Sequence, residues 1–231
     1  ERINIAKDTS FALLLEAQRR GYDSYYVEPG SLSIQHARAY GRLAQLHVKD
    51  DVRHSFELGE FQNAALASMS IVLMRKDPPV DDQFLYDTHI LSMAESEGVL
   101  VVNRPQGLRD MNEKLTALQF PQCCPETLVS RNLLELKAFI EKHQDTVVKP
   151  LDGMGGKSIF RIRHGESNVN VILETLTASG NLALAQKYIP EISLGDKRIL
   201  LIDGEPVPFA LARIPQGDEF RGNLAAGGRG Q

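Results

Sequence analysis

The chain has 231 residues, which is enough for one large domain or two small ones. Its net charge of −4 and its 24% of charged residues are typical of a globular protein and give no reason to expect nucleic-acid or membrane binding. No run of about 18 apolar residues could cross a bilayer, and the chain does not open with the charged-then-apolar pattern of a signal peptide.

The N-terminal part predicts a helix followed by strands. Residues 8–10 offer N-caps for a helix that extends through Arg20 and that a glycine then ends. Residues 22–27 are strand-like, and residues 31–57 hold short mixed runs that we interpret as strands. The histidines of this region are irregularly spaced, which favours surface or packing roles over metal ligation; they are His36, His47 and His54.

Two continuous apolar runs, residues 71–74 and 99–102, predict buried strands. Between them the sequence predicts a helix that ends near Glu97. Alternation of strand, helix and strand indicates parallel strands joined by a crossover helix, so we expect an α/β fold with an open parallel sheet.

Charged residues follow the first of these strands directly. Arg75, Lys76 and Asp77 precede the rigid pair Pro78 and Pro79. Open α/β sheets place ligands at the carboxyl ends of their strands. The sequence therefore allows either a substrate-facing edge or an ordinary solvated strand end.

Residues 103–109 are rich in turn formers and mark the predicted boundary between an N-terminal domain, residues 1–108, and a second domain, residues 109–231. Helices are expected from Asn112, from Asn132 through Lys142, and around residues 169–177. Strands are expected at residues 182–189, 199–202 and 207–214, the last two forming a hairpin in which Pro206 and Pro208 require an edge or a bulge.

A glycine-rich loop in the second domain joins two predicted strands. The first strand carries Lys149 and stops at Pro150, which cannot donate to a ladder. Gly153, Gly155 and Gly156 allow positive φ and close approach of the backbone to a ligand. A lysine beside bare amides forms a good phosphate cradle, although an ordinary tight hairpin would have the same pattern.

Two common phosphate-binding motifs do not fit this loop. Gly156, Lys157 and Ser158 look like the end of a P-loop, but that motif needs a glycine where Leu151 stands and opens a helix instead of a strand. The dinucleotide pattern fails because Ser158 occupies the place of its last glycine. A glycine-rich hairpin with a lysine on its first strand remains.

The loop 149–156 resembles the phosphate-covering loop of the ATP-grasp ligases, in particular that of the prokaryotic glutathione synthetase family. Further segments match this family in the same order, namely residues 75–79, 103–110, 112–115, 203–208, 213–217 and 221–230. The combination is specific, although no single segment is. The resemblance implies an N-terminal pre-ATP-grasp domain with an open parallel sheet, followed by an incomplete ATP-grasp domain.

The resemblance also implies an ATP site in the second domain. The lysines and the loop would hold the phosphates, the segment 186–189 would read and sandwich the adenine, and Asp196 would bind the ribose hydroxyls. The residues expected to bind the nucleotide are Lys114, Lys149, Gly153, Met154, Gly155, Gly156, Gln186, Lys187, Tyr188, Ile189 and Asp196.

The implied reaction is ATP-dependent joining of γ-glutamylcysteine and glycine through an acyl phosphate. Arg198 and Arg213 would balance charge on the acyl phosphate and the tetrahedral intermediate, and Arg221 would help to exclude water. Substrate binding is expected of Arg75, Asp77 and Asn223. No side-chain nucleophile is required.

The glycine-rich residues 214–231 predict a flexible segment. Because it carries Arg221, Asn223 and Arg229, it could be a lid over phosphate; a disordered tail is the alternative. By resemblance, a first strand would precede the chain, and a further segment holding the Mg²⁺ ligands would follow it. We therefore assign no metal residue and expect this chain to need that segment for activity.

The adjacent Cys123 and Cys124 suit loop or packing thiols in a reducing cytoplasm.

The resemblance to the family implies a homotetramer. Other interpretations are a different ATP-grasp ligase, for instance one joining amino acids or making D-alanyl dipeptides, a nucleotide-binding module without turnover, and a plain structural domain.

Overall fold

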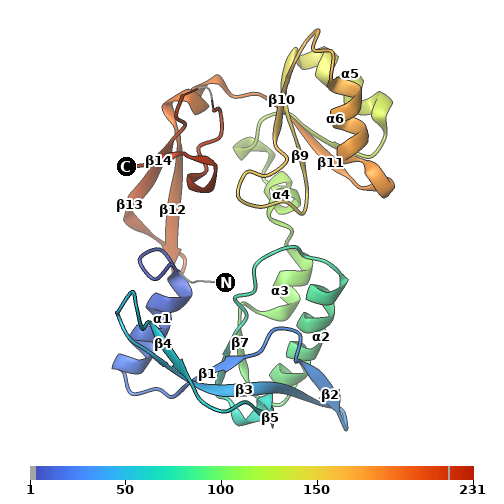
Figure 1. Cartoon of the computed structure of the whole chain (residues 1–231). Coiled ribbons are helices and arrows are strands. Elements are labelled where there is room, and N and C mark those ends of the chain that lie inside the picture. Colours follow the sequence, from blue (N-terminus) through green and yellow to red (C-terminus); the bar gives the residue numbers. More distant parts are fainter. Residues whose placement is uncertain (1–3, 218) are drawn as a thin grey trace. The chain divides into compact units, whose positions relative to one another are not determined.

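A computed structural model of the protein describes residues 4–217 and 219–231 (Figure 1). Contacts divide the chain into two compact units, residues 1–111 and residues 112–231. Within the described ranges, no helix is long and apolar enough to cross a membrane.

The first unit is a mixed α/β structure. Its elements are α1 (Thr9–Arg19), β1 (Ser24–Val27), β2 (Ser33–Gln35), β3 (Arg38–Val48), β4 (Phe56–Leu58), β5 (Gln62–Ala65), the 3-10 turn η1 (Leu66–Ser68), β6 (Ile71–Leu73), α2 (Asp82–Ser96), β7 (Leu100–Val102) and α3 (Pro105–Asp110). The predicted N-cap of α1 is confirmed, because Asp8 accepts a hydrogen bond from the backbone N–H of Phe11. Asp81 caps α2 in the same way, accepting from the N–H of Phe84.

Strand β3 organises the larger sheet of this unit. It pairs antiparallel with β1, β2, β4 and β5. In its first half alternate side chains are buried, and Ala39 and Leu43 join Leu91 of α2 and Val101 of β7 in the main core. Leu43 and Ala44 are both buried, so from Ala44 onward the buried side chains lie on the opposite face. A smaller core packs Phe11 of α1 against the other end of β3.

Strands β6 and β7 are parallel and are connected through α2, as the alternation predicts. The expectation that both runs are fully buried is wrong. Val72 and Val101 are buried, but the residues on either side of each project to the opposite face; Ile71 is 52% exposed and Leu100 is 57% exposed. Successive side chains on a strand point to opposite faces, and only one face of this pair meets the core.

The passage 103–109, which is rich in turn formers, is largely a helix, α3. Helix α3 starts at Pro105, whose missing N–H is no loss in the first turn of a helix. Its Arg109 guanidinium donates to Thr88 Oγ1 and Ser92 Oγ, both at 3.1 Å, and so ties α3 to α2. Local turn chemistry was overridden by this tertiary contact.

The second unit contains two sheets. Its elements are α4 (Glu113–Thr116), η2 (Ala117–Gln119), η3 (Pro121–Cys123), β8 (Thr127–Ser130), α5 (Leu133–His143), β9 (Asp145–Pro150), β10 (Phe160–Arg163), α6 (Val169–Leu176), η4 (Ala178–Gly180), β11 (Ala183–Lys187), η5 (Pro190–Leu194), β12 (Asp196–Ile202), β13 (Glu205–Ile214), η6 (Leu224–Ala226) and β14 (Arg229–Gly230).

Helices α5 and α6 cover one face of the antiparallel sheet β10-β9-β11-β8 (Figure 1). Leu136 and Ile140 of α5, Leu173 of α6, and Val148 and Ile162 of the sheet form the core between these layers. The predicted strand, glycine loop and strand are confirmed as β9, the loop and β10. The core therefore anchors both ends of the glycine loop.

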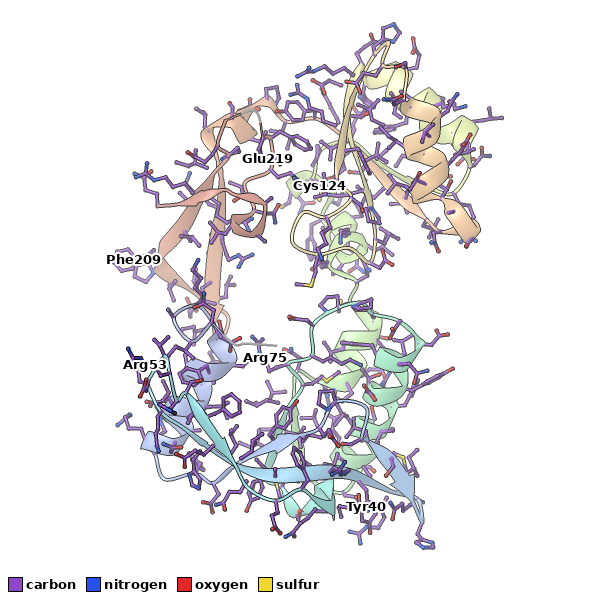
Figure 2. All side chains as sticks on the ribbon, viewed as in Figure 1. Tyr40, Arg53, Arg75, Cys124, Phe209 and Glu219 are labelled. Atoms are coloured by element: carbon purple, nitrogen blue, oxygen red, sulfur yellow. The ribbon has the colours of Figure 1, made fainter. Side chains whose placement is uncertain are left out.

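The second sheet, β12-β13-β14, is built on the predicted hairpin. Asp203 and Gly204 both have positive φ, 53° and 83°, as the turn of a two-residue hairpin requires. The register shifts between Ile199 and Leu201, opposite the proline-containing part of β13, which confirms the predicted bulge. Figure 2 shows Phe209 projecting from this hairpin, where it is 81% exposed.

Candidate functional site

A cavity of about 230 Å³ lies in the second unit, beside α4, the end of β9 and the glycine loop. It brings together the two predicted lysines, the three glycines of the loop and one lid residue. The lining residues are Glu113, Lys114, Lys149, Pro150, Gly153, Met154, Gly155, Gly156, Lys157, Ile159 and Asn223.

Lys114 holds the glycine loop to α4. Asn112 caps this short helix, and its Oδ1 accepts from the N–H groups of Lys114 and Leu115. The Lys114 ammonium then donates to the carbonyl oxygens of Leu151 at 3.1 Å and Gly153 at 2.8 Å, and it lies 2.9 Å from a Glu113 carboxylate oxygen. This loop-holding contact could not be read from the sequence.

Lys149 projects from β9 into the same cavity. Its Nζ donates to Gln186 Oε1 at 2.9 Å, and Gln186 Nε2 donates in turn to Thr127 Oγ1 at 3.0 Å. Burial lowers the pKa of Lys149 below its ordinary value, and the neighbouring charge of Lys114 lowers it further. A partly desolvated ammonium whose hydrogen-bond acceptor is a neutral amide is well suited to an anionic ligand.

The glycine loop uses its glycines for two different reasons. Gly155 and Gly156 have positive φ, 64° and 83°, as expected. A Cβ at Gly156 would also stand only 3.0 Å from Asn223 Oδ1. Gly153 has no positive φ, but a Cβ there would lie 3.0 Å from Pro150 Cγ. The close contacts at Gly156 and Gly153 come from the tertiary structure. From the sequence alone they cannot be distinguished from the general preference of glycine for turns.

Lys157 also lines the cavity, although no role was predicted for it once the P-loop had been excluded. Its side chain is exposed, and among the described residues it has no hydrogen bond or ion pair. Lys114 and Lys149, by contrast, are already engaged by protein acceptors.

Arg221 connects the lid, here residues 214–217 and 219–231, to the glycine loop. Its Nη1 donates to the Gly156 carbonyl oxygen at 2.6 Å, while Nε and Nη2 donate to the carboxylate of Glu219. This ion pair holds the pKa of Glu219 at about 2. Glu219 was missed by the sequence reasoning, and its position two residues before an arginine is a weak signal.

Asp196 and Arg213 face each other across β12 and β13. Arg213 donates from Nε and Nη2 to the two carboxylate oxygens of Asp196, both at 2.6 Å. The sequence reasoning assigned these residues to separate ligand groups and missed their pairing. Arg198 is exposed on β12, without an ion pair among the residues that the structure describes.

The expected adenine hinge, Gln186 to Ile189, ends β11. The N–H groups of Lys187 and Tyr188 already donate to backbone carbonyls, those of Glu126 and Asp145. The Arg161 guanidinium lies 3.5 Å from the centre of the Tyr188 ring and also pairs with Asp145. Ile189 is 48% exposed. Arg161 is a further neighbour of the hinge that sequence reasoning missed.

Arg75 and Asp77 belong to the first unit, and both are exposed. Arg75 Nε donates to Ser10 Oγ of α1 at 3.1 Å. Within residues 4–217 and 219–231, no group of three or more His, Cys, Asp or Glu residues could hold a metal ion.

Two family models match the chain in succession. Residues 1–109 match the N-terminal domain of prokaryotic glutathione synthetase, and residues 113–231 match its ATP-grasp domain. The chain belongs to the prokaryotic glutathione synthetase family. The predicted α/β fold, with an N-terminal domain followed by an ATP-grasp domain, is thereby confirmed, and this family membership makes the chain an ATP-dependent ligase.

Curated relatives named glutathione synthetase agree with the family models. The chain is 63% identical over 231 residues to the one from Xanthomonas axonopodis pv. citri (strain 306), covering 99% of the chain and 73% of that protein. It is 56% identical over 230 residues to the one from Escherichia coli (strain K12), with the same two coverages.

Solved structures at low identity share the fold. A RimK domain ATP-grasp protein from Sphaerobacter thermophilus aligns with a TM-score of 0.60 and 18% identity, over 95% of this chain and 76% of that one. The ATP-grasp ligase PsnB, complexed with a precursor peptide and AMPPNP, aligns with a TM-score of 0.51 and 16% identity, over 97% and 79%. Both support the ATP-grasp architecture of this family member.

Proposed function

We propose that the protein joins γ-glutamylcysteine to glycine at the expense of ATP, releasing glutathione, ADP and phosphate. The observation that carries this proposal is the 63% identity to a glutathione synthetase, over 99% of this chain and 73% of that protein. The cavity supports it, because its lysines and glycine loop offer the charge and the bare amides that nucleotide phosphates need.

The chemistry explains why such residues suffice. A carboxylate is a poor acyl donor, because its leaving group would be oxide. Transfer of the ATP γ-phosphoryl group to the carboxylate of γ-glutamylcysteine gives an acyl phosphate; the glycine amine then attacks the acyl carbon, and phosphate leaves. The protein's contribution is positioning and neutralisation of charge, not a covalent side-chain nucleophile.

In this proposal Lys149 and the amides of the glycine loop bind the phosphates, and Lys114 keeps the loop in place while contributing positive charge. The partly desolvated Lys149 gains most from a phosphate, since an anion restores the stability of its charged form. The segment from Gln186 to Ile189 holds the adenine, with the Tyr188 ring backed by Arg161.

Asp196 is proposed to accept the ribose hydroxyls, with Arg213 fixing the carboxylate in one orientation. Arg198, which is not paired within the described parts of the chain, is then the cation available to balance the acyl phosphate. Arg75, Asp77 and Asn223 are proposed to bind the amino-acid substrates, and Arg221 to act in the lid.

Three finer proposals rest on the family resemblance alone. Mg²⁺ accompanies the nucleotide, the enzyme works in the cytoplasm, and it assembles as a homotetramer. Light scattering of the full-length protein checks the assembly, where a mass of one or two chains would contradict it.

Product analysis tests the substrate assignment. The full-length protein with ATP, Mg²⁺, γ-glutamylcysteine and glycine should yield glutathione by mass spectrometry. D-Alanine, offered alone, should yield no dipeptide. A D-alanyl dipeptide without glutathione would replace this proposal with the other ATP-grasp ligase, and ATP binding without any product would indicate a binding module.

A further inference from the structure

One carboxylate organises the contact between the lid and the glycine loop. Glu219 Oε1 accepts from the backbone N–H groups of Phe220 at 3.0 Å and Arg221 at 3.1 Å, and from Arg221 Nε at 2.9 Å. Its Oε2 accepts from Arg221 Nη2. Glu219 therefore fixes both the local backbone turn and the plane of the arginine.

The third arm of the same guanidinium reaches across to the loop. Arg221 Nη1 donates to the Gly156 carbonyl oxygen at 2.6 Å, over a separation of 65 residues in sequence. A guanidinium is a rigid planar fork, so fixing Nε and Nη2 on Glu219 also determines where Nη1 points. The carboxylate thus directs the donor that meets the loop.

The fit around this contact is close. A Cβ on Gly156 would lie 3.0 Å from Asn223 Oδ1 and 3.4 Å from Arg221 Cδ. The lid consequently packs directly on bare backbone. We define the lid clasp as Glu219, Arg221, Asn223 and Gly156.

We propose that Glu219 is a positioning residue for ligation, which acts by holding Arg221 against Gly156 so that the lid stays closed on the glycine loop. This inference rests on the proposed function, because an acyl phosphate is the species that a closed lid protects. Water reaching that intermediate would release phosphate and regenerate the carboxylate, so ATP would be consumed without a peptide bond. The Arg221 pairing keeps the pKa of Glu219 at about 2, and the clasp therefore stays charged at neutral pH.

The test is Glu219→Gln in the full-length enzyme, with Glu174→Gln on α6 as a matched control. Loss of the charge-assisted pair should raise the ADP released per peptide bond formed by about threefold or more, while the KM for ATP changes less than about twofold. Glu219→Asp should recover part of the coupling. An unchanged ratio of ADP to peptide bond, or an equal rise in the Glu174 control, would overturn the proposal.

A double-mutant cycle separates positioning from general destabilisation. If Glu219 acts through Arg221, then Glu219→Gln should add less than about 1.5-fold to the uncoupling already caused by Arg221→Gln. If the two substitutions instead raise the ratio of ADP to peptide bond independently, so that their effects multiply in the double variant, that role is contradicted.

Deuterium exchange measures the same contact without turnover. The amides of residues 219–223 should exchange faster in Glu219→Gln than in Glu174→Gln, and equal exchange would count against the clasp.

The two proposals fail differently. If the wild-type enzyme makes no glutathione, the proposed function is wrong, whereas the exchange measurement still reports on the clasp. If the wild type makes glutathione and the Glu219 variant stays fully coupled, only the positioning role is wrong.

Discussion

Three lysines share one cavity, and their protein partners distinguish them. The Lys114 ammonium meets two loop carbonyls and a carboxylate, the Lys149 ammonium meets a neutral amide, and Lys157 has no partner among the described residues. A ligand anion therefore adds least to Lys114 and most to the other two. Lysine thus has two roles in this cavity: Lys114 holds the loop, whereas Lys149 and Lys157 are available to bind an anionic ligand.

Lys149→Met should weaken ATP binding at least about tenfold and leave the fold intact, because a partly buried ammonium without a carboxylate partner contributes little to stability.

The pKa of Lys149 is lowered in the folded state, so the folded state binds fewer protons than the unfolded state as pH approaches the ordinary value of 10.5. The free energy of unfolding attributable to Lys149 thus rises with pH through that window, and the variant should lose this slope. Denaturant titrations at several pH values check it; an unchanged slope would contradict the account.

Nucleotide binding should raise the pKa of Lys149, since a phosphate stabilises the ammonium that burial destabilises. NMR titration of the labelled lysine side chain, with and without ATP, measures this directly. A pKa that stays the same or falls on binding would place the phosphates elsewhere.

Lys157→Ala should raise the KM for ATP by about threefold to tenfold with little change in stability, as expected for an exposed cation near phosphate. Lys137→Ala on α5, away from the cavity, is the matched control. Steady-state kinetics decide the matter, and equal KM values for Lys157→Ala and the wild type would remove Lys157 from the site.

For single residues, the sequence predicted which residue types line the site but not which side chains pair with one another. The lysine and the glycines of the loop could be anticipated, because positive φ and phosphate affinity are local properties. The Asp196–Arg213 pair, the Arg161–Tyr188 contact and Glu219 depend on cross-strand register and on chain crossings, which local patterns do not encode.

The elements around the site are positioned by caps and turns. Asn112 starts α4 and Asn132 starts α5, and each accepts from a backbone N–H two residues ahead. Only the first of these helices carries a cavity lysine. The two asparagines are therefore a natural pair for separating the stability of a cap from its effect on the site.

Asn112→Ala and Asn132→Ala should each cost about 1 kcal/mol of stability, the usual value of a lost cap. Only Asn112→Ala should also raise the KM for ATP, because it releases the turn that places Lys114 on the loop. Chemical denaturation and kinetics on both variants check this. A KM effect of the same size in both would mean that Lys114 is placed by something other than its cap.

Helix ends were the most predictable elements, because caps and glycines act over one turn. Burial of β6 and β7 was predicted poorly, since an apolar run does not tell which of its two faces will be covered. Helix α3 was missed for a related reason: its proline and glycine favour a turn, while the contact from Arg109 to α2 favours a helix.

At the scale of the whole molecule, each unit has its own core. The core clusters of the described residues fall either within the first unit, around β3, or within the second, around α5 and α6. Two separate cores predict two calorimetric transitions. ATP at about 100 times its Kd should stabilise only the second unit, by about 2.7 kcal/mol. A single transition, or a shift confined to the first unit, would contradict this division.

The most direct test of the whole account is release of ADP by the full-length enzyme with ATP, Mg²⁺, γ-glutamylcysteine and glycine, each omitted in turn, beside Lys149→Ala. We predict that stoichiometric release requires both amino-acid substrates and is lost in the variant. Release that does not depend on γ-glutamylcysteine would contradict the glutathione assignment, and full activity of Lys149→Ala would contradict the role of the cavity.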